Sequence, residues 1–189
     1  RRADVIELHQ PLTPRMRSIQ NAIIQCLEAT LHQVKLSKLV TDLDDLNVEQ
    51  AMYRAFDVTV RRHLDPVWHR LSPATRQLVG DLYTLRQLLH ALLSYDSVSF
   101  YEYLETILAS NAPTSEPGAP QRQSQWLMSD EANLIFHEAR ARLWQEKQDD
   151  EGMSFELEEL PKWKLLAKVL DEVEQDIYLS LIHISERAG

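Results

Sequence analysis

The fold is decided by residues 56–108, which read FDVTVRRHLDPVWHRLSPATRQLVGDLYTLRQLLHALLSYDSVSFYEYLETIL. Leucine recurs in this stretch at steps of three and four residues, the spacing that places side chains on one face of an α-helix. The residues that we predict to pack in the core from this face are Leu78, Leu82, Leu85, Leu89 and Leu92. Such a broad apolar face predicts a helix that packs against more than one neighbour.

Local signals divide the same stretch into separate helices. Pro66 removes a backbone donor and disfavours helical geometry at Asp65, so we expect a kink or break there. Ser72 followed by Pro73 is typical of a helix start. Asp96 is predicted to cap the next helix. These three signals divide the segment into separate helical pieces.

Helical patterns continue on both sides of this stretch. Thr13 and Pro14 predict the start of a first helix, and Asn47 is a candidate cap for a short one. Further starts are predicted at Asp130 and Pro161. The tryptophans lie in or beside apolar stripes, so Trp68 and Trp163 are predicted as core anchors.

We predict an all-α fold, an irregular bundle of about six or seven helices with two flexible linkers. We expect residues 1–11 to be a lead-in, residues 12–176 the helical domain, and residues 177–189 a tail of uncertain origin. Within the domain, residues 110–125 are a loop rich in Pro and Ser, and residues 148–160 are an acidic linker. Because the chain begins with Arg1 rather than methionine, we expect it to be part of a longer protein.

Composition limits the function classes. The formal net charge is -9, which argues against a sequence-independent grip on nucleic acid while leaving room for a local basic face. Apolar residues make up 44% of the chain, enough for a core, yet no run reaches the roughly 18–20 residues of a membrane span. Cys26 is the one cysteine and has apolar neighbours, so we interpret it as a buried structural thiol.

Two motifs that resemble catalytic signatures are incomplete. His137-Glu138 begins a zinc-protease pattern, but Ala141 stands where the second histidine is required. Asp130-Glu131 resembles an acidic magnesium motif, but the chain has no glycine-rich phosphate loop ending in Lys-Ser or Lys-Thr. We therefore predict no catalytic residue, no metal ligand and no cofactor in this chain.

Arginine is concentrated in two places. The candidate DNA-binding residues are Arg61, Arg62, Arg70, Arg76, Arg140 and Arg142. A phosphate contact, a contact with an acidic protein partner and an ordinary solvated helix face all remain open for them.

An ordered set of motifs covers the chain from its first helix to about Glu174. The set is Met16-x-x-Ile19-Gln20-x-Ala22-Ile23, Phe56-Asp57, Leu64-Asp65-Pro66-x-Trp68-His69-x-Leu71, Leu78-Val79-x-Asp81-Leu82-x-x-Leu85-Arg86-x-Leu88-Leu89, Tyr95-Asp96-x-Val98-x-Phe100, Trp126-Leu127, Ala139-Arg140-Ala141-Arg142 and Pro161-Lys162-Trp163. In this order it resembles the XPF-type large subunit of the structure-specific DNA-repair endonuclease. The similar part is the helical region between that subunit's two helicase-like lobes, which implies that residues 1–11 lead in from a preceding lobe.

The resemblance implies a non-catalytic helical module of a nuclear endonuclease of nucleotide excision and interstrand crosslink repair. Its implied partners are the flanking helicase-like lobes, a nuclease scaffold protein, a smaller subunit bound through a distant region, and branched or forked DNA. Two alternatives stay open. One is a structural spacer that orders two lobes, and the other is an unrelated acidic helical protein-interaction domain.

Overall fold

A computed structural model describes residues 5–37, 47–51, 53, 55–112, 123–149 and 152–187. The chain divides into two compact units. One unit is residues 14–158, and the other combines residues 1–13 with residues 159–189.

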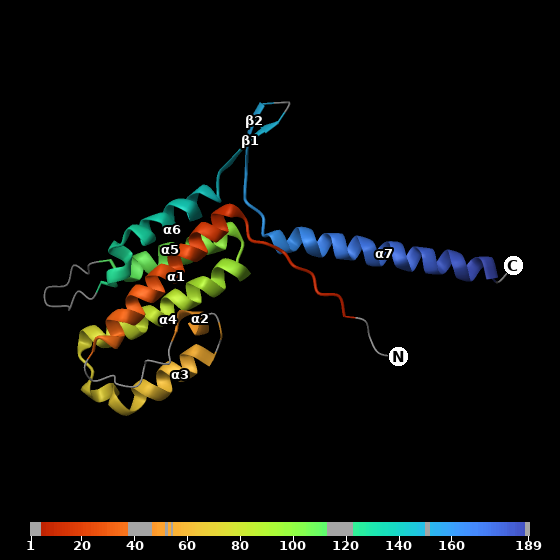
Figure 1. The fold of residues 1–189 in the computed structure, drawn as a ribbon. Helices are drawn as coiled ribbons and strands as arrows, with labels where there is room; N and C mark the ends of the chain where they lie inside the picture. Colours follow the sequence, from red (N-terminus) through yellow and green to blue (C-terminus); the bar gives the residue numbers. More distant parts are fainter. Residues whose placement is uncertain are drawn as a thin grey trace. The chain divides into compact units, whose positions relative to one another are not determined.

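The larger unit is built mainly from helices (Figure 1). Its elements are α1 (Pro14–Lys35), α2 (Val48–Ala51), α3 (Ala55–Leu64), the 3-10 helix η1 (Asp65–Arg70), α4 (Pro73–Ser94), α5 (Ser97–Ser110), the 3-10 helix η2 (Gln125–Met128), α6 (Asp130–Ala141), and the strands β1 (Gln145–Asp149) and β2 (Gly152–Glu156). The smaller unit contains α7 (Pro161–Arg187). With seven α-helices in the described part of the chain, the prediction of an all-α fold is confirmed.

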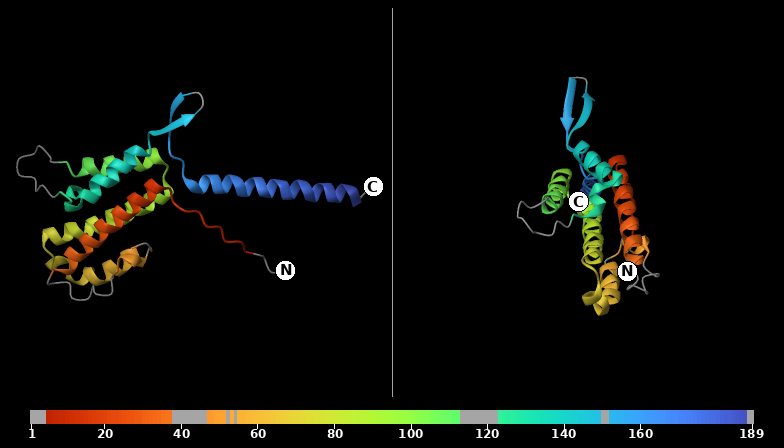
Figure 2. Two further views of the ribbon diagram at one scale, coloured as in Figure 1. Left: turned by 45° about the horizontal axis from the view of Figure 1, so that its top comes forward. Right: turned by 90° about the vertical axis from the view of Figure 1, so that its left-hand side faces the viewer.

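The core of the larger unit forms around α1. This helix contacts α4 and α6, and α5 in turn contacts both of those helices. The views in Figure 2 show α1 running alongside α4. Among the five predicted core leucines, Leu82, Leu85, Leu89 and Leu92 are buried, whereas Leu78 is half-buried. The faces of α1 and α4 that carry their apolar stripes therefore meet inside the unit.

The helix starts follow the local sequence signals in most places. Ser72 accepts a hydrogen bond from the backbone N–H of Thr75 at the start of α4. Asp96 accepts one from Ser99 at the start of α5. The predicted capping residue of α6 was wrong by one position, because Ser129 rather than Asp130 accepts a hydrogen bond from the backbone N–H of Ala132. Either side chain can cap a helix, so the extended backbone at Ser129 decides which one does.

The predicted break at Pro66 is present, and it changes the position of Trp68. Helix α3 ends at Leu64, and residues 65–70 continue as the 3-10 helix η1. Because a 3-10 helix has three residues per turn rather than 3.6, side chains after the break no longer line up with the apolar stripe of α3. Trp68 is 40% exposed, which corrects its assignment as a core anchor.

Trp163 also differs from its prediction as a core residue. It is 52% exposed on α7, and Leu166, Leu170 and Val173 of the same stripe are exposed as well. Among the described residues, α7 is the one helix of its unit, so no second helix of that unit covers the stripe. Helix α7 continues to Arg187, through most of the tail predicted for residues 177–189.

The two predicted linkers differ from each other in the structure. Residues 113–122 of the loop predicted at 110–125 lie outside the described residues, while Ser110 ends α5 and η2 begins at Gln125. The acidic linker predicted at 148–160 overlaps a hairpin that was not predicted and that begins before it, with β1 and β2 antiparallel and Gln145 opposite Glu156. Charged residues such as Glu and Lys are depleted in strands, which is why composition favoured a linker there.

The predicted domain boundaries and the compact units differ at the C-terminal end. We predicted a helical domain over residues 12–176, whereas the larger unit covers residues 14–158 and α7 lies in the other. Among the described residues, no helix combines the length and hydropathy needed to cross a bilayer.

Candidate functional site

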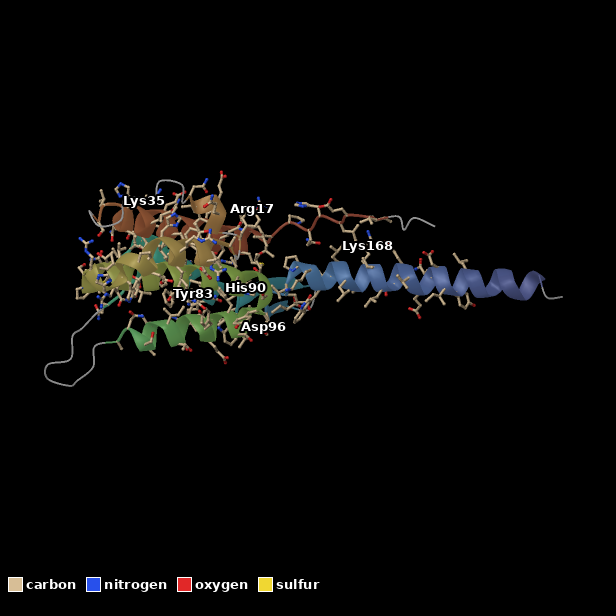
Figure 3. All side chains as sticks on the ribbon, turned by 90° about the horizontal axis from the view of Figure 1, so that it is seen from below. Arg17, Lys35, Tyr83, His90, Asp96 and Lys168 are labelled. Carbon is tan, nitrogen blue, oxygen red and sulfur yellow. The ribbon has the colours of Figure 1, made fainter. Side chains whose placement is uncertain are left out.

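A groove of about 480 Å³ opens between α3, η1 and α4. Its lining residues are Phe56, Asp57, Val60, Arg61, Asp65, Trp68, Arg76, Val79, Gly80, Leu82 and Tyr83. Phe56, Val60 and Leu82 are buried core residues, so the floor of the groove is apolar. Tyr83 is 52% exposed, and the groove therefore presents two accessible aromatic side chains, Tyr83 and Trp68. Figure 3 labels Tyr83 and His90, which both belong to α4.

Arg76 holds Trp68 in place. The guanidinium carbon of Arg76 lies 5.8 Å from the centroid of the Trp68 ring, within the range of a cation–π interaction. Its Nη2 donates to the backbone carbonyl of His69 at 3.3 Å. The Nε of Arg76 is buried, with no hydrogen-bond partner among the described residues. These contacts join η1 to the first turn of α4 and fix one wall of the groove.

A second arginine connects α3 to α4 near the other aromatic side chain. Arg86 of α4 donates from Nε to Oδ1 of Asp57 in α3 at 2.6 Å, and from Nη2 to Oδ2 of the same carboxylate. This two-point geometry is the stronger form of an arginine–carboxylate pair. The guanidinium carbon of Arg86 also lies 6.0 Å from the ring centroid of Tyr83. The pair links the two helices and compensates the negative charge of Asp57.

The structure distributes the six candidate DNA-binding arginines over different environments. Arg61 and Arg76 line the groove, and Arg62 and Arg70 are exposed on α3 and η1. Arg140 is exposed on α6, an element that contributes no residue to the groove. Four of the six thus come from α3, η1 and the start of α4, the three elements that form the groove.

Arg142 is the exception, and its assignment as a DNA contact is corrected. Its side chain is fully buried, and its Nε donates to Oε1 of Glu158 at 2.9 Å. Its guanidinium carbon lies 5.7 Å from the ring centroid of Phe100. Burial lowers the pKa of Arg142, and the neighbouring Glu158 carboxylate opposes that shift. A sequence pattern could not reveal this pairing, because Glu158 lies beyond the hairpin in a run of acidic residues.

A buried polar cluster on α4 was also missed by sequence reasoning. Asp81 accepts hydrogen bonds from Ser124 Oγ at 2.6 Å and from Gln77 Nε2 at 3.1 Å. Ser124 is in addition bonded through its backbone N–H to Asn111 Oδ1. Burial raises the pKa of Asp81, while the hydrogen bonds from Ser124 and Gln77 act in the other direction. The cluster fastens both ends of the segment between α5 and η2 to α4.

The other residues that were considered for catalysis or metal binding lie in surroundings that favour a structural role. Cys26 is buried, and burial raises the pKa of its thiol, in agreement with a structural role. His137 is exposed, and its neighbour Glu138 is paired with Arg15 at 3.0 Å. No group of three potential metal-ligating side chains comes together within the described ranges of the chain.

Asp57, Tyr83 and Arg86 lie in or beside the groove and were not selected as site residues from the sequence. Tyr83 and Arg86 are three residues apart, so a shared helix face was foreseeable. The pairing of Arg86 with Asp57 was not foreseeable, because it spans two helices.

No protein-family model matches the chain. DNA repair protein rad16 of Schizosaccharomyces pombe is 44% identical over 183 residues, which cover 94% of this chain and 20% of that protein. DNA repair endonuclease XPF of Cricetulus griseus is 36% identical over 188 residues, with 92% of this chain and 20% of that protein covered. DNA repair protein RAD1 of Saccharomyces cerevisiae is 30% identical over 172 residues, with 91% and 15% covered.

The chain spans about a fifth of the length of the first two relatives. The matched part includes nearly all of the helices described above. The resemblance found in the sequence is thereby confirmed: over most of its length, this chain is homologous to a segment of the XPF family of DNA repair endonucleases.

Proposed function

We propose that this chain is a non-catalytic helical module of a structure-specific DNA repair endonuclease, and that it docks a scaffold protein and helps to engage DNA junctions. The homology to XPF-family endonucleases supports the setting in DNA repair. The matched segment covers 20% of each of the first two relatives, so the catalytic residues of the parent lie outside it in this proposal.

The observation that carries the docking role is the groove between α3, η1 and α4. Its floor is apolar, and its walls are aromatic residues accompanied by arginines. Tryptophan, tyrosine and arginine are the residues that most often dominate binding energy at protein interfaces. An exposed aromatic groove of this kind suits a protein partner better than a small charged substrate.

Calorimetric titration of the intact protein with the binding segment of the nuclease scaffold tests this role. We expect saturable binding that is weakened when groove residues are substituted. Absence of binding by a protein that melts cooperatively would contradict the docking function.

Engagement of junction DNA is the second function in the proposal. Arg61, Arg62 and Arg70 support it, because they are exposed cations on adjoining elements of an otherwise acidic chain. Neutralisation of phosphates by such residues releases counterions and makes binding depend on salt. Charge reversal of these arginines, combined with the salt dependence of binding to forked DNA, tests this part separately.

The proposal places the protein in the nucleus, beside two helicase-like lobes of the same chain and a smaller subunit bound elsewhere. A spacer that only orders the two lobes is the competing function. Substitutions of exposed groove residues distinguish a docking module from a spacer, because in a spacer they would have no effect on partner binding. They would weaken partner binding in a docking module.

A further inference from the structure

We infer that the groove between α3, η1 and α4 binds an acidic segment of a partner protein, which inserts one large apolar side chain against Trp68. This inference rests on the proposed docking function and deepens it, because it names the chemistry of the partner.

The size of the groove favours a single anchoring side chain. Its volume of about 480 Å³ lies within the range of roughly 300–1,000 Å³ of ordinary binding pockets. The floor made by Phe56, Val60 and Leu82 offers only apolar contacts. A space of this size takes one aromatic or branched side chain with its neighbours at the rim, rather than a whole helix.

The charge around the groove favours acidic residues beside that anchor. Arg61 and Arg76 line it, and Arg62 and Arg70 are exposed on the same elements. Of the two lining carboxylates, Asp57 is compensated by Arg86, which leaves Asp65. The groove is thus a basic area on a chain whose formal net charge is -9. Complementary charge of this kind speeds association and excludes wrong partners.

The walls are also held in place before any partner arrives. The guanidinium of Arg76 lies beside the ring of Trp68, and Arg76 is itself bonded to the carbonyl of His69. Tyr83 is accompanied by Arg86, which is anchored on Asp57. Side chains that are already ordered lose little conformational entropy on binding, so more of the contact energy remains as affinity.

A nucleic acid fits the groove less well than a peptide. A phosphate backbone would leave the apolar floor unused, although a base could stack on Trp68. Binding of single-stranded DNA is therefore an alternative outcome of the test.

Gly80 provides a variant that blocks the groove without disturbing the fold. It lines the groove in the interior of α4, and a Cβ added there would meet no heavy atom within 4 Å. Glycine is also the poorest ordinary helix former after proline. Gly80→Glu should therefore fold at least as well as the parent while it fills the groove and repels acidic ligands. Gly80→Ala is the matched control for the backbone.

The test is fluorescence anisotropy of the intact protein with a labelled acidic peptide that carries one central tryptophan. Two matched peptides have that tryptophan changed to alanine, or the acidic residues changed to glutamine. We expect Gly80→Glu and Trp68→Ala to weaken binding by about tenfold or more, the effect of removing a hot-spot residue. Gly80→Ala, and the exposed Trp144→Ala and Arg140→Glu outside the groove, should bind like the parent.

The inference is overturned if the acidic peptide does not bind, or if it binds Gly80→Glu as tightly as the parent. It is also overturned if labelled oligothymidylate binds in a way that depends on Trp68 and Gly80 while the acidic peptide does not. Titration of the same variants with the scaffold separates the two proposals. If the scaffold binds the parent and Gly80→Glu equally, the proposed docking function stands but the groove is not the docking site. If the scaffold binds neither the parent nor Gly80→Glu, the proposed docking function itself is contradicted.

Discussion

Arg142 and Glu158 form a buried ion pair that closes the root of the β1–β2 hairpin. The Nε of Arg142 lies 2.9 Å from Oε1 of Glu158, and the two side chains are 0% and 6% exposed. The backbone N–H of Glu158 also donates to the carbonyl of Arg142 at 2.9 Å. Arg142 precedes β1 and Glu158 follows β2, so this contact joins the two ends of the hairpin where it leaves α6.

Removing one member of this pair should be costly. In Glu158→Ala the guanidinium of Arg142 stays buried without its carboxylate, and we expect a loss of about 3–5 kcal/mol in the free energy of unfolding. Urea denaturation followed by circular dichroism measures it.

The control is the double variant Arg142→Met, Glu158→Leu, which replaces both charges by apolar side chains. It should recover most of the lost stability, because no isolated charge remains buried. Equal stability of Glu158→Ala and the parent would show that the pair does not hold the root of the hairpin.

The core face of α4 gives a second prediction. Leu85 is fully buried, so Leu85→Ala leaves a cavity and should cost about 2–5 kcal/mol of unfolding free energy. The matched control is Leu108→Ala on the exposed side of α5, where we expect a change of about 1 kcal/mol or less. Thermal and urea denaturation of both variants check the difference. A parent-like melting temperature for Leu85→Ala would contradict the placement of this face in the core.

The buried carboxyl of Asp81 predicts a dependence of stability on pH. Burial raises its pKa in the folded chain above the ordinary value of 3.8, so the folded state holds the proton more tightly than the unfolded state. Stability that comes from this group therefore falls as pH rises from about 4 through the raised pKa. Asp81→Asn should remove this fall, since its amide oxygen can still accept the hydrogen bonds of Ser124 and Gln77.

Asp96 provides the control of opposite sign. The backbone N–H and the hydroxyl of Ser99 lower the pKa of Asp96, so its contribution to stability is present above the unfolded pKa and lost as pH falls through the folded one. Urea denaturation at a series of acidic and neutral pH values measures the free energy of unfolding as a function of pH. For Asp81→Asn this free energy should vary less than in the parent over the upper part of the acidic range. For Asp96→Asn it should vary less than in the parent at the lowest pH values. Identical pH profiles for Asp81→Asn and the parent would contradict the effect of burial.

The exposed arginines predict how junction DNA is bound. Combined substitution Arg61→Glu, Arg62→Glu and Arg70→Glu should weaken binding of the intact protein to forked DNA. It should also reduce the slope of log affinity against log salt, by roughly 0.9 for each phosphate of duplex DNA that is no longer neutralised. Anisotropy titrations at several salt concentrations measure both quantities. Arg17→Glu, exposed on α1, is the matched control. An unchanged slope would remove these arginines from the DNA-binding proposal.

Local chemistry allowed much of the fold to be predicted. The starts of α4 and α5 follow Ser72 and Asp96, and the break before η1 follows Pro66, because caps and proline act within one helical turn. The apolar period of α4 likewise selected Leu82, Leu85, Leu89 and Leu92, which are buried.

The hairpin was not predictable in the same way. Its strands carry charged side chains that disfavour strands when each is considered alone. Pairing with the opposite strand and the Arg142–Glu158 contact at its root are interactions between residues that are distant in sequence.

The order of residues alone determined the helical class of this protein, most helix starts and its relationship to XPF-family endonucleases, because periodicity, capping and homology can all be read along one chain. Only the tertiary structure decided that Arg142 is buried on Glu158, that Trp68 is left on a groove wall, and that Arg86 neutralises Asp57. Whether a charged or aromatic side chain is exposed, paired or buried depends on which helices pack together. That choice is made by the packing of distant elements.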